Sequence, residues 1–371
     1  MQATATYLNT AAVFEASFIT RAVGRRHVSL HALSALDDAL TATRKYRPRG
    51  SGQWFWVVLV TLFVGSPALS VPTGGVGGGG AGGEFSQGPG AGPSAPDIGM
   101  ELVAAAVAAL AVVWLLVAVL GALLEFPFLH WLRDGEASVG DAVGDHGRQA
   151  LGLAAFRVVV GGLGLAVLGA AVLLQVGTDG TLLEYVAALS NVAVLAGLVG
   201  FPLSVLNAFT TAFVVPTMLL EDSGVLAGWR RFWDTLADAP KQFAAYGVAV
   251  IVLGYAGGIA VVLLAVLALI PGLVVGGILG LVAAIAVAPF VGIIFAAAFG
   301  GLAFTIAALA AYALFQIYLR YYALLVLGDV DDDLDYIPGR RGKVRSDGPG
   351  NPVADPTDPG ASDGDDPQFP S

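Results

Sequence analysis

The feature that most constrains this chain is a series of uncharged, apolar segments that are too long for a soluble fold. No charged residue occurs between Lys241 and Arg320, and other apolar runs exceed the roughly 20 residues that a helix needs to cross a bilayer. The chain is 56% hydrophobic and 12% charged, whereas soluble proteins carry about 25% charged residues. A soluble fold would have too few polar residues to coat so large a core. The sequence therefore predicts an all-α, polytopic transmembrane helical bundle.

The apolar segments predict six crossings of the membrane, arranged as three hairpins with interfacial connecting helices. They lie at residues 54–69, 100–132, 156–176, 182–220 and 243–270, with a last segment that ends near residue 327. Pro202 and Pro216 are expected to kink the fourth segment, and Pro271 with Gly272 to end the fifth. This count leaves residues 270–289 over, and we expect them to form a re-entrant or strongly tilted apolar pair near the outer face. Eight crossings is the other even solution.

Changes in composition divide the chain into five parts. Residues 1–27 are expected to be a poorly ordered extension, and residues 28–49 a cytoplasmic amphipathic helix with Leu33, Leu36 and Leu40 on one face. The other parts are the transmembrane bundle at 50–328 with a Gly-rich external loop at 71–99, an acidic and then basic segment at 329–345, and a disordered acidic tail at 346–371.

Positive charge is distributed unevenly among the connecting segments. Lys and Arg occur before the first apolar segment and after the second, the fourth and the last, whereas the loops at 71–99 and 177–181 carry neither. Lys and Arg accumulate on the cytoplasmic side of membrane proteins. The pattern therefore predicts a multi-pass protein of the cell membrane with both termini in the cytoplasm.

The charge balance and the absence of cysteine bear on habitat and chemistry. The formal net charge is −10, with six Asp between Asp347 and Asp366 and only three Lys in the chain. A composition that is acidic and poor in Lys and Cys favours a halophilic source, although a GC-rich genome would also enrich Arg, Ala, Gly and Val. Without Cys there is no disulfide, thiolate metal site or cysteine nucleophile. No pattern indicates a cofactor, a metal site or a nucleic-acid partner.

Three helix ends resemble one another and predict an internal repeat. They read LLEFPFLHWLRD at 123–134, TAFVVPTMLLED at 211–222 and YLRYYALLVLGD at 318–329, which places Glu125, Phe213 and Arg320 at the same position. Ionisable residues at membrane depth usually pair with one another. We therefore expect Glu125 and Arg320 to form a pair near the cytoplasmic leaflet. The alternative is that each side chain reaches the lipid headgroups independently.

Two further groups of polar residues are candidates for a site. Asn207, Thr210, Thr211 and Gln316 lie within apolar helices, where hydrogen bonds between helices are a more common role than a substrate path. The segment 221–242 predicts a helix that lies in the membrane plane. On that helix, a lipid headgroup could contact Trp229, Arg230, Arg231 and Trp233, although simple anchoring at the interface explains the same residues.

Four stretches carry a resemblance to a known family. LDDALTATR at 36–44, FTTAFVVPTMLLEDSGVLAGWRRFW at 209–233, YLRYYALLVLGD at 318–329 and IPGRRGKVR at 337–345 resemble an uncharacterised family of multi-pass membrane proteins from halophilic archaea. The second stretch is also distantly similar to the membrane domain that accompanies some glycerophosphoryl diester phosphodiesterases. The resemblance implies a membrane bundle and no activity, and the catalytic barrel of the phosphodiesterases has no counterpart here.

These observations favour a non-enzymatic membrane protein that acts as a scaffold, an accessory subunit or a lipid-interacting bundle. Its expected partners are membrane lipids, and no protein partner can be named from the sequence. The alternative is a transporter or channel for a small molecule or ion, with a site among the second, fourth and sixth helices. A lipid-modifying enzyme is disfavoured because it would need His, Asp or Glu gathered at the interface, and the acids are scattered.

Overall fold

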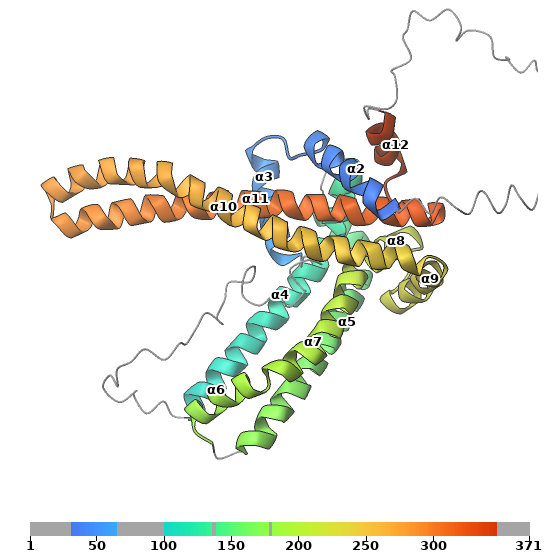
Figure 1. Ribbon diagram of the computed structural model, residues 1–371, viewed down its shortest axis with the longest axis horizontal. Coiled ribbons are helices and arrows are strands. Elements are labelled where there is room, and N and C mark those ends of the chain that lie inside the picture. Colours follow the sequence, from blue (N-terminus) through green and yellow to red (C-terminus); the bar gives the residue numbers. More distant parts are fainter. Residues whose placement is uncertain (1–30, 65–99, 136–138, 178–179, 347–371) are drawn as a thin grey trace, which may run out of the picture.

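The computed structural model describes residues 31–64, 100–135, 139–177 and 180–346, and throughout these ranges the regular structure is helical, with no strand (Figure 1). The prediction of an all-α helical bundle is confirmed. Four predicted features lie outside the described residues: the N-terminal extension at 1–27, the end of the first apolar segment at 65–69, the Gly-rich loop at 71–99, and the acidic tail from residue 347 onward.

The described helices form a compact hub from which two apolar arms diverge (Figure 1). In the hub, helices α2, α8, α9 and α12 meet the C-terminal ends of α4 and α11 and the N-terminal ends of α5 and α10. The first arm consists of the outer parts of α4, α5 and α7 together with α6, and the second arm is the outer half of the α10–α11 hairpin. The elements are α2 (His31–Lys45), α3 (Ser51–Phe63), α4 (Met100–Asp134), α5 (Val139–Val176), α6 (Leu182–Asn191), α7 (Ala193–Phe209), the π-helical turn η1 (Thr210–Val214), α8 (Val215–Leu220), α9 (Val225–Asp238), α10 (Pro240–Ala286), α11 (Pro289–Val330), the 3-10 turn η2 (Asp332–Leu334) and α12 (Pro338–Ser346).

Five helical stretches are long and apolar enough to cross a membrane, by length and composition. They are Ala111–Asp134, Gly144–Val176, Ala193–Leu220, Pro240–Ala286 and Pro289–Val330. Helix α3 is apolar but has 13 residues, fewer than the roughly 20 that a straight crossing requires. The chain is therefore a membrane-embedded helical protein, and a sixth crossing would have to be completed by α3 and the residues that follow it.

The predicted end of a helix at Pro271 is wrong. Helix α10 continues through Pro271 to Ala286, and a short turn leads into α11, so that residues 270–289 form the tip of a continuous hairpin. A proline inside a helix removes one backbone hydrogen bond and crowds the carbonyl of the preceding turn, and contacts with α11 outweigh this cost. Gly272 allows α10 and α11 to approach closely. A Cβ at this position would lie 2.6 Å from the Cβ of Ala303 and 2.8 Å from the carbonyl oxygen of Phe299.

The fourth apolar segment also breaks at an unexpected place. The sequence predicts kinks at Pro202 and Pro216, but the chain leaves helical geometry at Val192, between α6 and α7, and Pro202 lies within α7. A five-residue π-helical turn, Thr210–Val214, then precedes Pro216 at the start of α8. A π turn inserts an extra residue into a helix and is frequent at functional positions.

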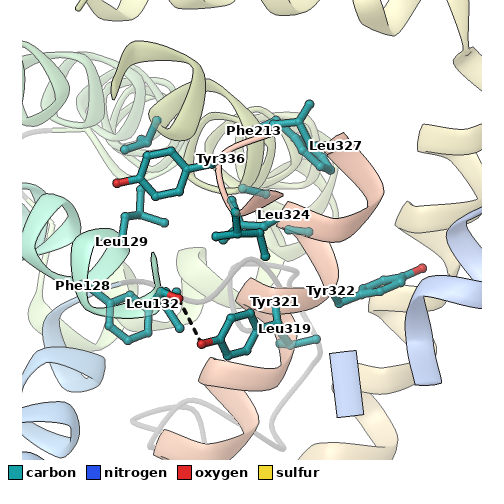
Figure 2. Packing of buried hydrophobic residues seen from close by; sticks show 14 of the residues in the cluster. Phe128, Leu129, Leu132, Phe213, Leu319, Tyr321, Tyr322, Leu324, Leu327 and Tyr336 are labelled. Carbon is teal, nitrogen blue, oxygen red and sulfur yellow. Dashed lines mark hydrogen bonds between the residues drawn. The ribbon is translucent and has the colours of Figure 1, made fainter. Parts of the chain in front are cut away.

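The centre of the hub is the last part of α11. Every residue from Leu319 to Gly328 is buried, so this stretch is enclosed on all sides. Figure 2 shows Leu324 and Leu327 of α11 near Phe213, and Tyr321 directed toward Leu132 of α4. The Tyr321 hydroxyl donates a hydrogen bond to the Leu132 carbonyl at 3.1 Å, which satisfies one of the carbonyl groups left without a partner at the end of α4.

Helix α2 packs against α11 through its alanines. Its four alanines at positions 32, 35, 39 and 42 are essentially fully buried, whereas Leu33 and Leu40 are exposed. Small side chains allow two helices to approach closely. Leu33 and Leu40 therefore remain available to the membrane, whereas Leu36 is partly buried against the core.

Candidate functional site

A buried ion network at the hub joins three helices. Glu125 of α4 is fully buried, and each of its carboxylate oxygens meets a different arginine. Oε1 pairs with Nη2 of Arg320 on α11, and Oε2 lies 3.1 Å from Nη2 of Arg157 on α5. The network thus contains two guanidinium groups and one carboxylate, which leaves an excess of positive charge inside the protein.

The π turn explains why Arg320 has a second partner. The N–H of Val215 donates to the carbonyl of Thr210, five residues back. The next donor in such a turn would serve the carbonyl of Thr211, but it would come from Pro216, which has no N–H. Nη1 of Arg320 donates to this Thr211 carbonyl instead. The guanidinium therefore satisfies a main-chain oxygen that would cost free energy if it were buried without a partner.

Arg157 is the functional residue that sequence reasoning missed. The sequence pattern starts the third apolar segment at residue 156, so Arg157 reads as a cation at the edge of the preceding polar loop, but α5 begins at Val139 and carries Arg157 into its apolar part. Nη2 of Arg157 also donates to Oγ1 of Thr211 at 3.0 Å. A signal was available, because Arg157 is the one charged residue between Arg148 and the end of α5, and isolated charges within apolar helices usually have a partner.

A cavity of about 370 Å³ adjoins the network between α4, α5 and α7. Arg157, Ser204 and Asn207 supply its polar lining, and apolar residues such as Trp114 and Leu203 supply most of the rest. The Nε atom of Arg157 is buried and has no hydrogen-bond partner among the described residues. The arrangement can hold an anionic or hydrogen-bonding group, and its apolar walls suit the tail of an amphiphile.

The structure separates the four residues of the predicted polar stripe. Asn207 lines the cavity, whereas the hydroxyl of Thr210 accepts a hydrogen bond from Trp229 Nε1 at 3.0 Å and donates one to the Leu206 carbonyl at 2.7 Å. Thr211 binds both arginines of the ion network. Gln316 is buried on α11, and its Nε2 has no hydrogen-bond partner among the described residues. The four side chains therefore do not line one common path.

Helix α9 divides the predicted headgroup residues between interior and surface. Arg231 pairs with Asp331 at 2.9 Å and with Glu221 at 3.3 Å, and Trp229 reaches Thr210. Arg230 and Trp233 are exposed. Trp229 and Trp233 border an apolar groove of about 490 Å³ between α7, α9 and α10. Of the predicted set, Arg230 and Trp233 remain available to a headgroup.

The acidic and basic residues after α11 pair with each other. Arg341 of α12 lies 3.2 Å from Asp329 and 2.9 Å from Asp332, and Arg345 lies 2.7 Å from Asp329 and 3.0 Å from Asp38 of α2. Hydrogen bonds and ion pairs with Asp332, Asp335 and Asp329 raise the pKa of Arg341 despite its partial burial. The segment at 329–345 therefore folds back on itself and fixes α12 to α2.

Replacing Asp331 by asparagine should lower the free energy of unfolding by about 1 kcal/mol at neutral pH, because its carboxylate accepts hydrogen bonds from both Arg231 and Thr235. Burial alone would raise the pKa of Asp331, but these hydrogen bonds outweigh it and lower the pKa. The contribution is therefore complete above the ordinary carboxylate pKa of about 3.9 and is lost as the pH falls through the lower pKa of the folded state.

Thermal unfolding in detergent at pH 7 and at pH 3 checks this prediction. The difference between wild type and Asp331→Asn should shrink at pH 3, whereas Asp234→Asn, an exposed substitution on α9, should change little at either pH. An equal difference at both pH values would show that the carboxylate charge of Asp331 contributes nothing.

Comparisons with known proteins give one match. The model of a family of unknown function (DUF7544) matches residues 30–337. No curated protein and no solved structure matches the chain. The halophilic source and the likeness to the phosphodiesterase membrane domain stay predictions.

Proposed function

The chain belongs to this family of unknown function, and we propose that it is a non-enzymatic, lipid-interacting bundle of the cell membrane. The observation that carries the proposal is the contrast between its arms and its hub. The arms expose apolar side chains to their surroundings, whereas the charged side chains buried in the hub, Glu125 and Arg320 among them, make contacts that hold helices together.

The second arm illustrates the apolar surface. Its exposed residues include Leu263, Leu267, Ile278 and Leu281 of α10 and Ile293 of α11, all more than half exposed. Exposing such a surface to water is unfavourable, because each Å² of apolar area costs about 25 cal/mol of free energy. Lipid tails provide the matching environment, and the two helices use their glycines to pack against each other.

The distribution of charge supports a cytoplasmic hub. Within the described residues, the cations outside the ion network gather at the hub, on α2, α9 and α12, in the segment between α2 and α3, and at the hub ends of α4, α5 and α10. The far ends of the arms carry acids at Glu101 and Glu184 and no Lys or Arg. This distribution follows the rule that cations stay on the cytoplasmic side.

Single cysteines test this orientation cleanly because the chain has none of its own. A membrane-impermeant maleimide should label Thr181→Cys, at the far end of the first arm, in intact cells. It should label Arg148→Cys, at the hub, only after the membrane is permeabilised. Labelling of Arg148→Cys in intact cells would contradict a cytoplasmic hub.

Reconstitution into sealed lipid vesicles tests the function itself. We expect native mass spectrometry to show lipid retained on the purified protein, and we expect the vesicles to remain as tight to protons and small ions as protein-free vesicles. Retention of no lipid at all would contradict a lipid-interacting role.

The cavity beside Arg157 favours one second candidate, a transporter or channel. A transport site should combine polar groups with access from water or lipid, and Arg157, Ser204 and Asn207 offer such groups. Ion or solute flux through the vesicles that is lost on replacing Asn207 by alanine would favour this alternative over the bundle.

A further inference from the structure

A second cavity, also of about 370 Å³, lies at the hub where α3 begins and α4 ends. Four cations line it, namely Lys45, Arg47, Arg49 and Arg340, against one acid, Asp134. The whole chain carries a net charge of −10, so this local excess of positive charge is opposite in sign to the protein. Clustered cations in a concave site attract anions.

The position of Arg340 is fixed by contacts with its neighbours. Its guanidinium stacks over the ring of Tyr46, 4.2 Å from the ring centre, and its Nη1 donates to the hydroxyl of Tyr321. Its Nη2 lies 3.5 Å from the carbonyl oxygen of Trp131 and close to Gly135, whose φ of 84° permits the turn that ends α4. These contacts fix the guanidinium of Arg340 at the cavity wall. Its remaining N–H groups can donate hydrogen bonds to a ligand.

Several donors at this cavity have no partner within the described residues. Arg47 and Arg49 are exposed and make no ion pair there. The Nε1 atom of Trp131 and the hydroxyl of Tyr46 are buried without a hydrogen-bond partner. Buried donors are nearly always paired in folded proteins. A ligand that brings several acceptor oxygens would satisfy these groups.

The position of the cavity at the ends of the apolar helices indicates which kind of ligand supplies those oxygens. Gln53 lies in the first turn of apolar helix α3, and Trp131 lies near the end of apolar helix α4, so the cavity sits where the apolar lengths stop. From there, Phe55, Leu59 and Leu62 form an exposed apolar stripe along α3. A phosphate at the cavity with apolar chains beside α3 is the arrangement of a membrane lipid.

We propose that this cavity binds the phosphate of an anionic lipid headgroup, which the guanidinium groups of Arg47, Arg49 and Arg340 contact. The inference deepens the lipid-interacting function proposed above and rests on it. The site differs from the headgroup residues expected on α9, because it is built from α2, α3, α4 and α12 and the segment between α2 and α3.

A binding titration on the purified full chain tests the site. Phosphatidylglycerol should bind the wild type in detergent, and phosphatidylcholine should bind much more weakly. The exposed double substitution Arg47→Gln/Arg49→Gln should weaken phosphatidylglycerol binding about twenty-five-fold, since each cation near an anionic headgroup contributes about fivefold. Asp134→Asn should tighten it, because this carboxylate repels the phosphate. Arg148→Gln/Lys241→Gln, which removes two exposed hub cations elsewhere, is the matched control and should leave binding within about threefold.

Three outcomes would overturn the proposal. If the Arg47→Gln/Arg49→Gln protein elutes as a folded monodisperse species and binds phosphatidylglycerol within about threefold of wild type, the cavity is not the site, while retained lipid would leave the broader function standing. If soluble glycerol 3-phosphate binds as tightly as phosphatidylglycerol, the site serves a soluble phosphate and not a lipid. Absence of any bound lipid on the wild type would overturn the broader function as well.

Discussion

Glutamine in place of Glu125 should destabilise the protein by about 3–5 kcal/mol, because it leaves two buried guanidinium groups without the carboxylate that they share. The side chains of Arg320 and Arg157 are 2% and 11% exposed, so water cannot replace the lost charge. The measurement is the yield of monodisperse protein in detergent together with its thermal unfolding. Glu221→Gln, which removes a carboxylate that pairs with the partly exposed Arg231, should cost less than about 1 kcal/mol.

The contacts of this network predict which of its two arginines contributes more to stability. Arg157→Met leaves the Glu125–Arg320 pair, which is neutral and retains the contact with the Thr211 carbonyl. Arg320→Met removes that contact as well and leaves a main-chain oxygen without a partner. We therefore expect Arg320→Met to be the more damaging change, by about 1–3 kcal/mol. Equal losses for the two arginines would contradict the role assigned to the π turn.

A double-mutant cycle separates a true pair from two independent residues. Alanine at both Glu125 and Arg320 should cost less than the sum of the two single changes, because either single change already disrupts the pair. Strictly additive losses would mean that the two side chains do not stabilise one another.

The candidate site could be anticipated from the sequence only in part. Glu125 and Arg320 are isolated charges in apolar helices, which is a strong signal, and the structure brings them together. The role of the Thr211 carbonyl could not be anticipated, since it depends on a π turn that follows from packing rather than from residue preference. The sequence pattern puts Arg157 at the very end of the third apolar segment, where cations commonly flank a membrane helix, whereas α5 begins at Val139 and places Arg157 well inside it.

The predicted helix end at Pro271 and Gly272 failed because these residues have a different role in membrane helices. In soluble helices both residues mark ends, but in membrane helices both are tolerated, and glycine often marks a contact between helices. Pro271 lies inside α10, and Gly272, Gly276 and Gly280 recur at four-residue intervals on its buried face. The spacing was visible in the sequence, whereas the identity of the opposing helix required the structure.

Leucine in place of Gly276 should open the hairpin of α10 and α11, at a cost of about 3 kcal/mol. A Cβ at Gly276 would lie 2.7 Å from the Cβ of Phe299, 2.9 Å from the Cα of Ala296 and 2.9 Å from the carbonyl oxygen of Phe295. Two of these three atoms belong to the main chain of α11, which cannot turn aside as a side chain can. The two helices would have to move apart along much of the second arm, and each would lose dispersion contacts that lipid replaces only in part.

The neighbouring residue supplies the control. Gly277 is exposed and has nothing within 4 Å of a Cβ built on it, so Gly277→Leu adds the same apolar volume to the same helix without a clash. It should unfold at the wild-type temperature or slightly above, because leucine favours the helix by close to 1 kcal/mol over glycine. Thermal unfolding of the two variants in one detergent compares them directly. If both were equally harmful, the loss would come from added bulk on the arm's surface, and close contact between α10 and α11 would not be what holds the arm together.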